Sequence, residues 1–228
     1  MKLNFEIDGA DGGAALTIDI DHLVIAGWTG RDAQSIAHHI EELAALGVPP
    51  PSRVPLFYRV ASNQLSQADR IEVVGEQTSG EVEPFVFCHD GLLYLSIASD
   101  HTDRRLETDS VALSKQVCAK PVARHAWRLD DVAERWDELT IRSHIVEDGR
   151  QTLYQEGKLS ALREAGSLLA DYFAGRPAMR AGFGMSCGTL AAVGGIRPAT
   201  QFAMELIDPS TGRRIAHEYA IETLPVIS

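Results

Sequence analysis

The sequence lacks an excess of positive charge. Its 228 residues include 21 Lys or Arg against 32 Asp or Glu, which gives a formal net charge of -11 at pH 7. A nucleic-acid surface needs clustered cations that displace counterions from the phosphates. We therefore expect no nucleic-acid partner.

Cysteine is scarce, and long apolar runs are missing. Cys88, Cys118 and Cys187 lie far apart without C-x-x-C spacing, so neither a disulfide framework nor a zinc site is indicated. No window approaches about 18 uninterrupted apolar residues. The start "MKLNFEIDGADGG" has acidic residues where a signal peptide has an apolar core. We therefore expect a cytoplasmic protein with no membrane partner.

What the sequence does have is many short strand-like segments. "LNFEI", "LTIDI" and "HLVIAGW" predict an N-terminal β-meander over residues 1–26, with a turn at residues 9–13. Further apolar or alternating runs follow in the middle of the chain, and a C-terminal hairpin closes on "DPSTG". We expect one domain over residues 1–228, in which residues 27–228 form the core that carries the motifs.

Three segments predict helices between these strands. In "RDAQSIAHHIEELAALG" the apolar residues follow helical spacing, with Asp32 as the N-cap and Gly47 as the stop. "RLDDVAERWDEL" and "GKLSALREAGSLLADYFAG" predict two more helices, the second of them long. The expected fold class is therefore α+β and rich in strands.

An acidic pair stands inside an otherwise apolar strand, "TSGEVEPFVF". Glu81 and Glu83 are two positions apart, so in a strand they share a face and repel each other unless something lies between them. If Asp100 of "SDHTDRR" lies on a neighbouring strand, the three carboxylates form an oxygen site for Mg²⁺, Mn²⁺ or Ca²⁺. The alternative is that these acids line a solvated face of the sheet.

A second pair lies on the first predicted helix, in "HHIEEL". His39 and Glu42 are three residues apart, a spacing at which a carboxylate can orient an imidazole as a general base. A solvated pair would show the same spacing. If the helix turns Glu41 inward instead, His38 and Glu41 form the equivalent pair.

Taken in order, these segments resemble the fumarylacetoacetate hydrolase superfamily, and more closely an uncharacterised bacterial group, DUF2848-like, within or beside it. "HIEELAALGVPPPSRVPLFYRV" looks like the family's H-x-x-E-L-G stretch followed by proline and F-x-K, and "GEVE" is similar to its E-x-E pair. "SDHTDRRLE" resembles N-D-[VM]-[ST]-A-R-D-x-Q, "SKQVCAKP" resembles G-K-S-x-D-x-x-x-P, and "CGTLAAVGG" resembles G-T-P-x-G-V-G.

The resemblance implies a mixed β-roll with a few flanking helices, commonly a homodimer. It also implies a divalent cation, Mg²⁺ or else Mn²⁺ or Ca²⁺, that binds a small anionic 2-oxo or 2,4-dioxo acid for hydrolytic cleavage of a carbon–carbon bond. Decarboxylation, isomerisation and hydration of the same substrates are alternatives. The implied metal ligands are Glu81, Glu83 and Asp100, the catalytic residues His39, Glu42 and Lys115, and the substrate contacts Arg59, Thr102, Arg104 and Thr189.

Several positions depart from the family pattern. Ser99 stands where the family has Asn, Asp103 where it has Ala, Arg105 where it has Asp, and Leu190 where it has Pro. Arg59 stands where Lys is frequent, and either Arg59 or Arg104 could form a structural ion pair instead of a substrate clamp. A non-catalytic metabolite-binding module is therefore a competing hypothesis, although a relic site has no physical need for mutually repelling acids.

Overall fold

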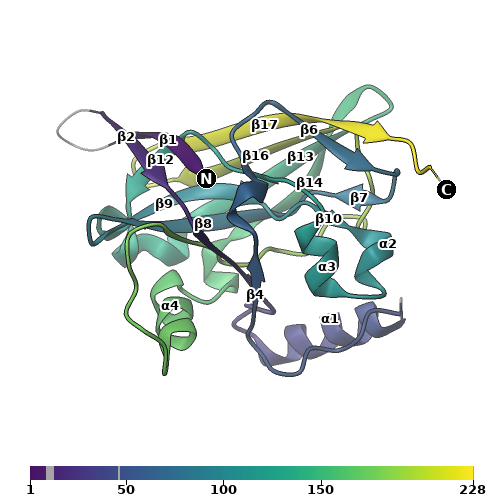
Figure 1. Ribbon diagram of the computed structural model, residues 1–228, viewed down its shortest axis with the longest axis horizontal. Helices are drawn as coiled ribbons and strands as arrows, with labels where there is room; N and C mark the ends of the chain where they lie inside the picture. Colours follow the sequence, from purple (N-terminus) through teal and green to yellow (C-terminus); the bar gives the residue numbers. More distant parts are fainter. Residues whose placement is uncertain (9–12, 46, 228) are drawn as a thin grey trace.

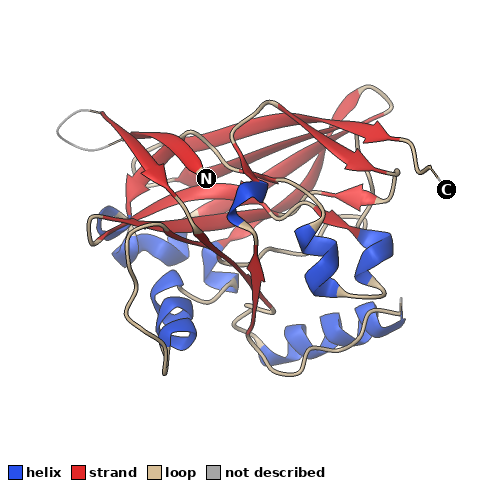
Figure 2. Ribbon diagram, viewed as in Figure 1, coloured by secondary structure: helices blue, strands red, loops and turns tan. Residues whose placement is uncertain are grey.

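The computed structural model describes residues 1–8, 13–45 and 47–227, and within the first helix it leaves undescribed the side chains at positions 35, 38, 39, 42, 43 and 45. Strands dominate the described chain, and the helices lie along one side of them (Figures 1 and 2). This confirms the predicted strand-rich α+β class. None of the described helices is long and apolar enough to cross a lipid bilayer.

Two large sheets account for most of the described strands. The first has the order β2-β1-β12-β9-β8-β15-β3-β4 and the second the order β14-β13-β16-β17-β6. The strands of the first sheet are β1 (Lys2–Ile7), β2 (Ala14–Asp19), β3 (His22–Gly27), β4 (Leu56–Val60), β8 (Val82–His89), β9 (Leu92–Ser99), β12 (His125–Arg128) and β15 (Phe183–Ser186). Those of the second are β6 (Arg70–Val74), β13 (Thr140–Glu147), β14 (Arg150–Lys158), β16 (Gln201–Asp208) and β17 (Arg213–Leu224).

Short elements connect these sheets and surround one end of β8 and β9. The short strands are β5 (Leu65–Ser66), β7 (Thr78–Ser79), β10 (Thr102–Asp103) and β11 (Lys120–Pro121). The helices are α1 (Ala33–Ala45), α2 (Arg104–Glu107), α3 (Val111–Gln116) and α4 (Ala165–Phe173). α1 lies beside α2 and α3 in Figure 1.

Both faces of β8 are buried, which explains its continuous apolar character. Val86 and Cys88 pack in the core that the first sheet shares with the second. Phe85 and Phe87, which alternate with them, pack in a separate core with residues of β1, β3 and β9. Glu83 continues the row of Phe85 and Phe87, so the strand carries this carboxylate into an apolar interior.

The N-terminal prediction is right for the first hairpin and wrong for the third strand. β1 and β2 pair antiparallel as expected, while the turn at residues 9–12 lies outside the described residues. β3 does not join them as a meander, because it pairs with β4 on one side and parallel to β15 on the other. Parallel pairing over such a long separation leaves no local signal in the sequence.

The helix predictions are partly confirmed. α1 occupies the predicted segment, Asp32 accepts a hydrogen bond from the Gln34 amide at 3.4 Å, and Gly47 follows with φ of 89°. The second predicted helix is instead two 3₁₀ turns, Leu129–Asp131 and Ala133–Glu138.

The third predicted helix starts too early. Its first residues belong to β14 and a 3₁₀ turn, so only Ala165–Phe173 is α-helical. Strand pairing with β13 holds the backbone up to Lys158 extended and overrides the local apolar periodicity. The C-terminal hairpin of β16 and β17 is confirmed.

Candidate metal and active site

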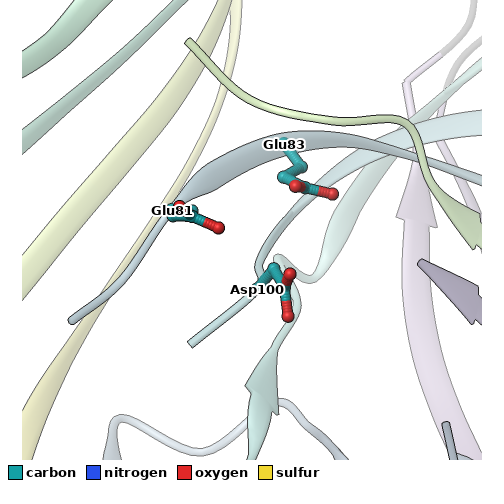
Figure 3. A group of neighbouring side chains, drawn as sticks. All are labelled: Glu81, Glu83 and Asp100. Carbon is teal, nitrogen blue, oxygen red and sulfur yellow. The ribbon is translucent and has the colours of Figure 1, made fainter. Parts of the chain in front are cut away.

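Glu81, Glu83 and Asp100 converge at one end of β8 and β9. One carboxylate oxygen from each lies within 4.8 Å of the others, and the three side chains face a common space (Figure 3). Glu81 lies just before β8, Glu83 is its second residue, and Asp100 follows the last residue of β9. The backbone amide of Asp100 donates to the carbonyl of Glu81 at 3.0 Å, which holds the two segments together. The structure thus brings the three predicted acids together at the ends of two neighbouring strands, and their role as metal ligands stays a prediction.

Of the three acids, Glu83 is the one whose ionised form is disfavoured by its surroundings. Its exposed fraction is 2%, and the described contact to its carboxylate is the backbone amide of Gly188, which donates to Oε2 at 3.2 Å. Burial, and then repulsion from Asp100 and Glu81, raises the pKa of Glu83 well above its usual range. A cation among the three oxygens would remove this repulsion.

Asp100 is held between two lysines. Lys115 Nζ donates to Oδ2 at 2.5 Å, and Lys120 Nζ lies 3.0 Å from Oδ1 and also donates to the carbonyl of His101 at 2.5 Å. Although burial opposes ionisation of Asp100, Lys115 and then Lys120 lower its pKa below the usual range. Burial lowers the pKa of Lys115 less than the neighbouring carboxylates raise it, so its pKa lies above the usual range. Asp100 is therefore a carboxylate and Lys115 an ammonium at neutral pH.

Arg104, the first residue of α2, connects the acid cluster to this helix. Its Nη2 lies 3.0 Å from Glu81 Oε1, its Nη1 donates to Glu107 Oε2 at 2.9 Å, and its Nε donates to Ser79 Oγ at 2.7 Å. Burial of the guanidinium is outweighed by Glu81 and Glu107, which raise the pKa of Arg104. The predicted arginine therefore does reach the site, where it pairs with protein carboxylates.

His101 lies beside Asp100 and is fully buried. Its Nδ1 lies 3.0 Å from the Tyr219 hydroxyl and its Nε2 lies 2.9 Å from Thr78 Oγ1. Burial, with help from Lys120, lowers the pKa of His101 to about 3. This imidazole is neutral at physiological pH, and its two hydrogen bonds hold the segment that contains Asp100 in place.

The donor set fits a hard divalent cation. Carboxylate oxygens are the ligands that Mg²⁺, Mn²⁺ and Ca²⁺ prefer. Asp100 Oδ1 is buried and makes no hydrogen bond within the described chain, although Lys120 lies beside it. The observation that a bound cation would explain is the buried carboxyl of Glu83, whose pKa is raised by burial and by repulsion from the other two acids. Glu81, Glu83 and Asp100 are the residues that would hold it.

The remaining predicted substrate contacts lie at different distances from this cluster. Thr102 is buried next to it, and its hydroxyl donates to the Asp100 carbonyl at 2.9 Å. Thr189 donates to the Val82 carbonyl at 2.8 Å and accepts from Gln155. Both hydroxyl protons are therefore used inside the protein, and their contact with substrate stays a prediction.

Arg59 is not brought to the acids. It is exposed on β4, and adjacent residues of a strand point to opposite faces. Its neighbour Tyr58 faces the site, with the ring centroid 5.8 Å from Lys115 Nζ. The role predicted for Arg59 therefore has no support from its position.

The predicted base pair falls on α1. The side chains of His39 and Glu42, and that of the alternative base His38, lie outside the described residues. The backbone does place these positions on α1, which lies beside α2 and α3 in Figure 1. Glu41, the alternative partner of His38, is exposed.

Two residues of the site were not predicted from the sequence. Lys120 holds the second oxygen of Asp100, and Tyr58 covers Lys115. The segment "SKQVCAKP" contains both lysines, so the signal for Lys120 was present beside Lys115. What places Lys120 is the parallel pairing of β11 with β5, in which Lys120 lies opposite Leu65.

Comparison with known proteins now identifies the family. The sequence model of DUF2848, described as a protein of unknown function, matches residues 26–219. The chain therefore belongs to the DUF2848 family. No curated protein matches the chain.

Solved structures identify the fold. A yeast fumarylacetoacetate hydrolase family protein is similar with a TM-score of 0.63 and 14% identity, over 91% of this chain and 95% of that one. A 2-keto-3-deoxy-D-arabinonate dehydratase, complexed with magnesium and 2,5-dioxopentanoate, is similar with a TM-score of 0.65 and 16% identity, over 92% of this chain and 75% of that one. The predicted fold of the fumarylacetoacetate hydrolase type is confirmed.

Proposed function

We propose that this protein is a divalent-metal-dependent enzyme that cleaves a carbon–carbon bond of a small 2,4-dioxo acid by hydrolysis. The observation that carries the proposal is the convergence of Glu81 with the buried acids Glu83 and Asp100, with Lys115 bound to Asp100. Three converging acids, with the buried carboxyl of Glu83 repelled by the other two, are a costly arrangement unless a cation binds there. The similarity of fold to a fumarylacetoacetate hydrolase family protein supports the choice of hydrolysis.

The residues divide the chemical work between binding and charge stabilisation. A divalent cation held by Glu81, Glu83 and Asp100, with Mg²⁺ our first choice, would supply Lewis-acid polarisation of the 2-oxo group. Lys115 is a fixed ammonium next to these acids, so it can stabilise negative charge that develops on a substrate oxygen. Its raised pKa makes it unsuitable as a general base.

The hydrolysis needs no reagent other than the dioxo acid and water. A water oxygen adds to the carbon of the 4-oxo group, the bond between C3 and C4 breaks, and its electron pair passes to C3, which is conjugated with the 2-oxo group. C3 then takes up a proton, and the products are a 2-oxo acid and a carboxylic acid. His39, oriented by Glu42, remains our candidate to remove the proton from water. Thr102 and Thr189 remain candidates for substrate contacts.

Dehydration or hydration of a 2-oxo acid is the second candidate. The specific observation in its favour is the similar fold of a dehydratase whose structure holds magnesium and 2,5-dioxopentanoate. Loss or gain of water next to a 2-oxo group also draws electrons toward that group, and the same acids and Lys115 would serve. Decarboxylation, isomerisation and metabolite binding without turnover are the remaining alternatives.

The decisive experiment follows the enol absorbance of acetylpyruvate in the ultraviolet, with Mg²⁺ or Mn²⁺ and with EDTA. We expect metal-dependent loss of absorbance for the wild type and none for Glu83→Gln. The control is Glu6→Gln, at an exposed position of β1, which should match the wild type. No loss with either metal, from protein shown to be folded by circular dichroism, would refute hydrolysis.

We also propose, from the family resemblance, that the protein is a cytoplasmic homodimer. Light scattering after size-exclusion chromatography tests the oligomeric state. A monomer at all accessible concentrations would contradict the dimer and leave the proposed chemistry intact.

A further inference from the structure

A β-bulge interrupts β14 where this strand contacts the loop at residues 187–200, which follows β15. Gln155 lies opposite Ser143 of β13, but the next residue of β13 lies opposite Leu153. Tyr154 is thus an extra residue in β14. Adjacent residues of a regular strand point to opposite faces, yet both Tyr154 and Gln155 are buried. Bulges redirect side chains in this way, and this one turns Gln155 into the interior.

The side-chain amide of Gln155 makes four hydrogen bonds. Its Oε1 accepts from the Val82 amide at 3.0 Å and from Ser143 Oγ at 2.9 Å. Its Nε2 donates to Thr189 Oγ1 at 2.7 Å and to the Leu190 carbonyl at 2.6 Å. A carboxamide has two N–H donors and an oxygen with two lone pairs, so every polar position of this buried group is used.

These hydrogen bonds join the 187–200 loop to the strand of the candidate metal ligands. Val82 separates the two glutamates of the site; its amide donates to Gln155, and its carbonyl accepts from Thr189 at 2.8 Å. The amide of Gly188, which precedes Thr189, donates to Glu83 Oε2 at 3.2 Å. Gln155 therefore contacts both the backbone that carries Glu83 and the loop whose amide binds its carboxylate.

Further contacts hold the same loop on β14. The Val193 amide donates to the Tyr154 carbonyl at 2.7 Å, and the Arg197 amide donates to the Tyr154 hydroxyl at 3.3 Å. A Cβ on Gly157 would lie 2.7 Å from Leu190 Cδ1, so the strand and the loop approach closely here. Among these contacts, the side-chain amide at the bulge is the one that also reaches β8.

We propose that Gln155 is a positioning residue of the candidate metal site. It holds the 187–200 loop against β8, so that the Gly188 amide stays on the Glu83 carboxylate and Thr189 keeps its place beside the strand. The inference rests on the proposed function in treating Glu83 as a ligand of a divalent cation. Gln155 acts through these neighbours and not by contact with the metal. Loss of a group that orients a metal ligand typically weakens metal binding by about 10- to 100-fold.

Gln155→Met tests this role, because methionine has a similar length and makes none of the four hydrogen bonds. Gln67→Met is the matched control. Gln67 is also a buried glutamine, but its amide bonds to the backbone of Asn4 and Ala123. Both variants lose the hydrogen bonds of a buried amide, so a general loss of stability is common to the two.

Two measurements follow the loop and the metal separately, at a temperature where circular dichroism shows each variant to be folded. Hydrogen exchange of metal-free protein, read by mass spectrometry, should be faster over residues 187–193 in Gln155→Met and unchanged there in Gln67→Met. Mn²⁺ titration, read from the electron paramagnetic resonance signal of free Mn²⁺, should show binding about tenfold weaker or more in Gln155→Met. Gln67→Met should bind Mn²⁺ as the wild type does.

Gln155→Glu keeps the test decisive if Gln155→Met does not fold. This variant preserves the shape of the side chain and the oxygen that accepts from Val82. It has at most one proton to donate, so it cannot bond both Thr189 and the Leu190 carbonyl. We expect faster exchange over residues 187–193 and weaker Mn²⁺ binding, each by less than in Gln155→Met.

The outcomes separate this inference from the proposed reaction. Wild-type Mn²⁺ affinity or wild-type exchange over residues 187–193 in a folded Gln155 variant would overturn the inference, as would an equal loss of affinity in Gln67→Met. A wild type that binds no Mn²⁺ would refute the metal site of the proposed function, and this inference with it. Weakened Mn²⁺ binding by the Gln155 variants of a protein that cleaves no acylpyruvate would support the inference and refute the hydrolase.

Discussion

Lys115 Nζ lies 2.5 Å from Asp100 Oδ2, and both side chains are buried. The pair joins α3 to the segment after β9, so it links a candidate metal ligand to the cation that we assign to charge stabilisation. Because Lys120 holds the other oxygen of Asp100, the carboxylate keeps one charged partner when Lys115 is removed.

Lys115→Met should lower kcat by roughly 100- to 1,000-fold, the usual effect of removing a group that stabilises developing oxyanion charge. It should also lower the free energy of unfolding by about 1–3 kcal/mol, since Asp100 loses a hydrogen-bonded partner in a buried place. Steady-state kinetics and urea unfolding measure the two effects. Lys158→Met, at an exposed position on β14, is the control. A folded Lys115→Met enzyme with wild-type kcat would contradict the assignment.

Glu83→Gln should separate metal binding from folding. In metal-free protein, replacing a repelled buried carboxyl by its neutral isostere should leave Tm unchanged or raise it. Mg²⁺ should raise the Tm of the wild type, because a ligand that binds only the folded state stabilises it, and should not raise that of the variant. Thermal unfolding with Mg²⁺ and with EDTA measures both. A Mg²⁺-dependent shift in Glu83→Gln would remove this residue from the ligand set.

His101 should make the protein sensitive to acid. Its pKa is lowered by burial to about 3 in the folded state, against about 6.5 when unfolded. The unfolded state therefore binds a proton first, and the contribution of His101 to stability is present above pH 6.5 and lost as the pH falls from there toward 3.

Urea unfolding between pH 8 and pH 4 should show this loss for the wild type. His101→Gln should show a shallower dependence on pH, at the cost of some stability from its two hydrogen bonds. His125→Gln, on the half-exposed end of β12, is the control and should retain the wild-type slope. Parallel curves for the wild type and His101→Gln would show that another group controls acid unfolding.

Gly188→Ala should damage the fold and the site together. Gly188 has φ of 94°, and a Cβ there would overlap the hydroxyl of Thr29. We expect a loss of more than about 2 kcal/mol in the free energy of unfolding. The Gly188 amide also donates to Glu83, so weaker Mg²⁺ binding should accompany the loss.

Gly212→Ala is the control that tests the strain of a positive φ alone, without the steric overlap that a Cβ would meet at Gly188. Gly212 has φ of 73°, and a Cβ there meets nothing within 4 Å. It should therefore cost only the strain of the left-handed conformation and leave Mg²⁺ affinity unchanged. Equal destabilisation by the two variants would show that the overlap at Gly188 relaxes without cost.

The sequence predicts those parts of the site in which residues that are close in the chain are also close in the structure. The two-residue spacing of Glu81 and Glu83 fixes a common face, and the strand that precedes Asp100 brings it opposite them. The sequence was less informative about Lys120 and Arg59. Lys120 depends on a two-residue parallel pairing, and the facing direction of Arg59 depends on the register of β4 with β3.

The same limit explains the errors in the fold. Residues 129–138 have helical periodicity but form 3₁₀ turns, and residues 157 and 158 follow the pairing of β14 with β13. In each case long-range packing overrides a local preference. The place of β3 in the sheet could not be read from neighbouring residues, because its partner β15 begins at Phe183.

This insertion of β15 between β3 and β8 has a consequence for biosynthesis. The chain must be made as far as Ser186 before the first sheet can close around β8, so a nascent chain that already carries Glu81, Glu83 and Asp100 cannot yet assemble its interior. Pairings of such high contact order are slow to form. From the synthesis of Asp100 until that of Ser186 the acids therefore belong to an incomplete sheet, and the proposed ion-binding centre can form only after β15 has been made.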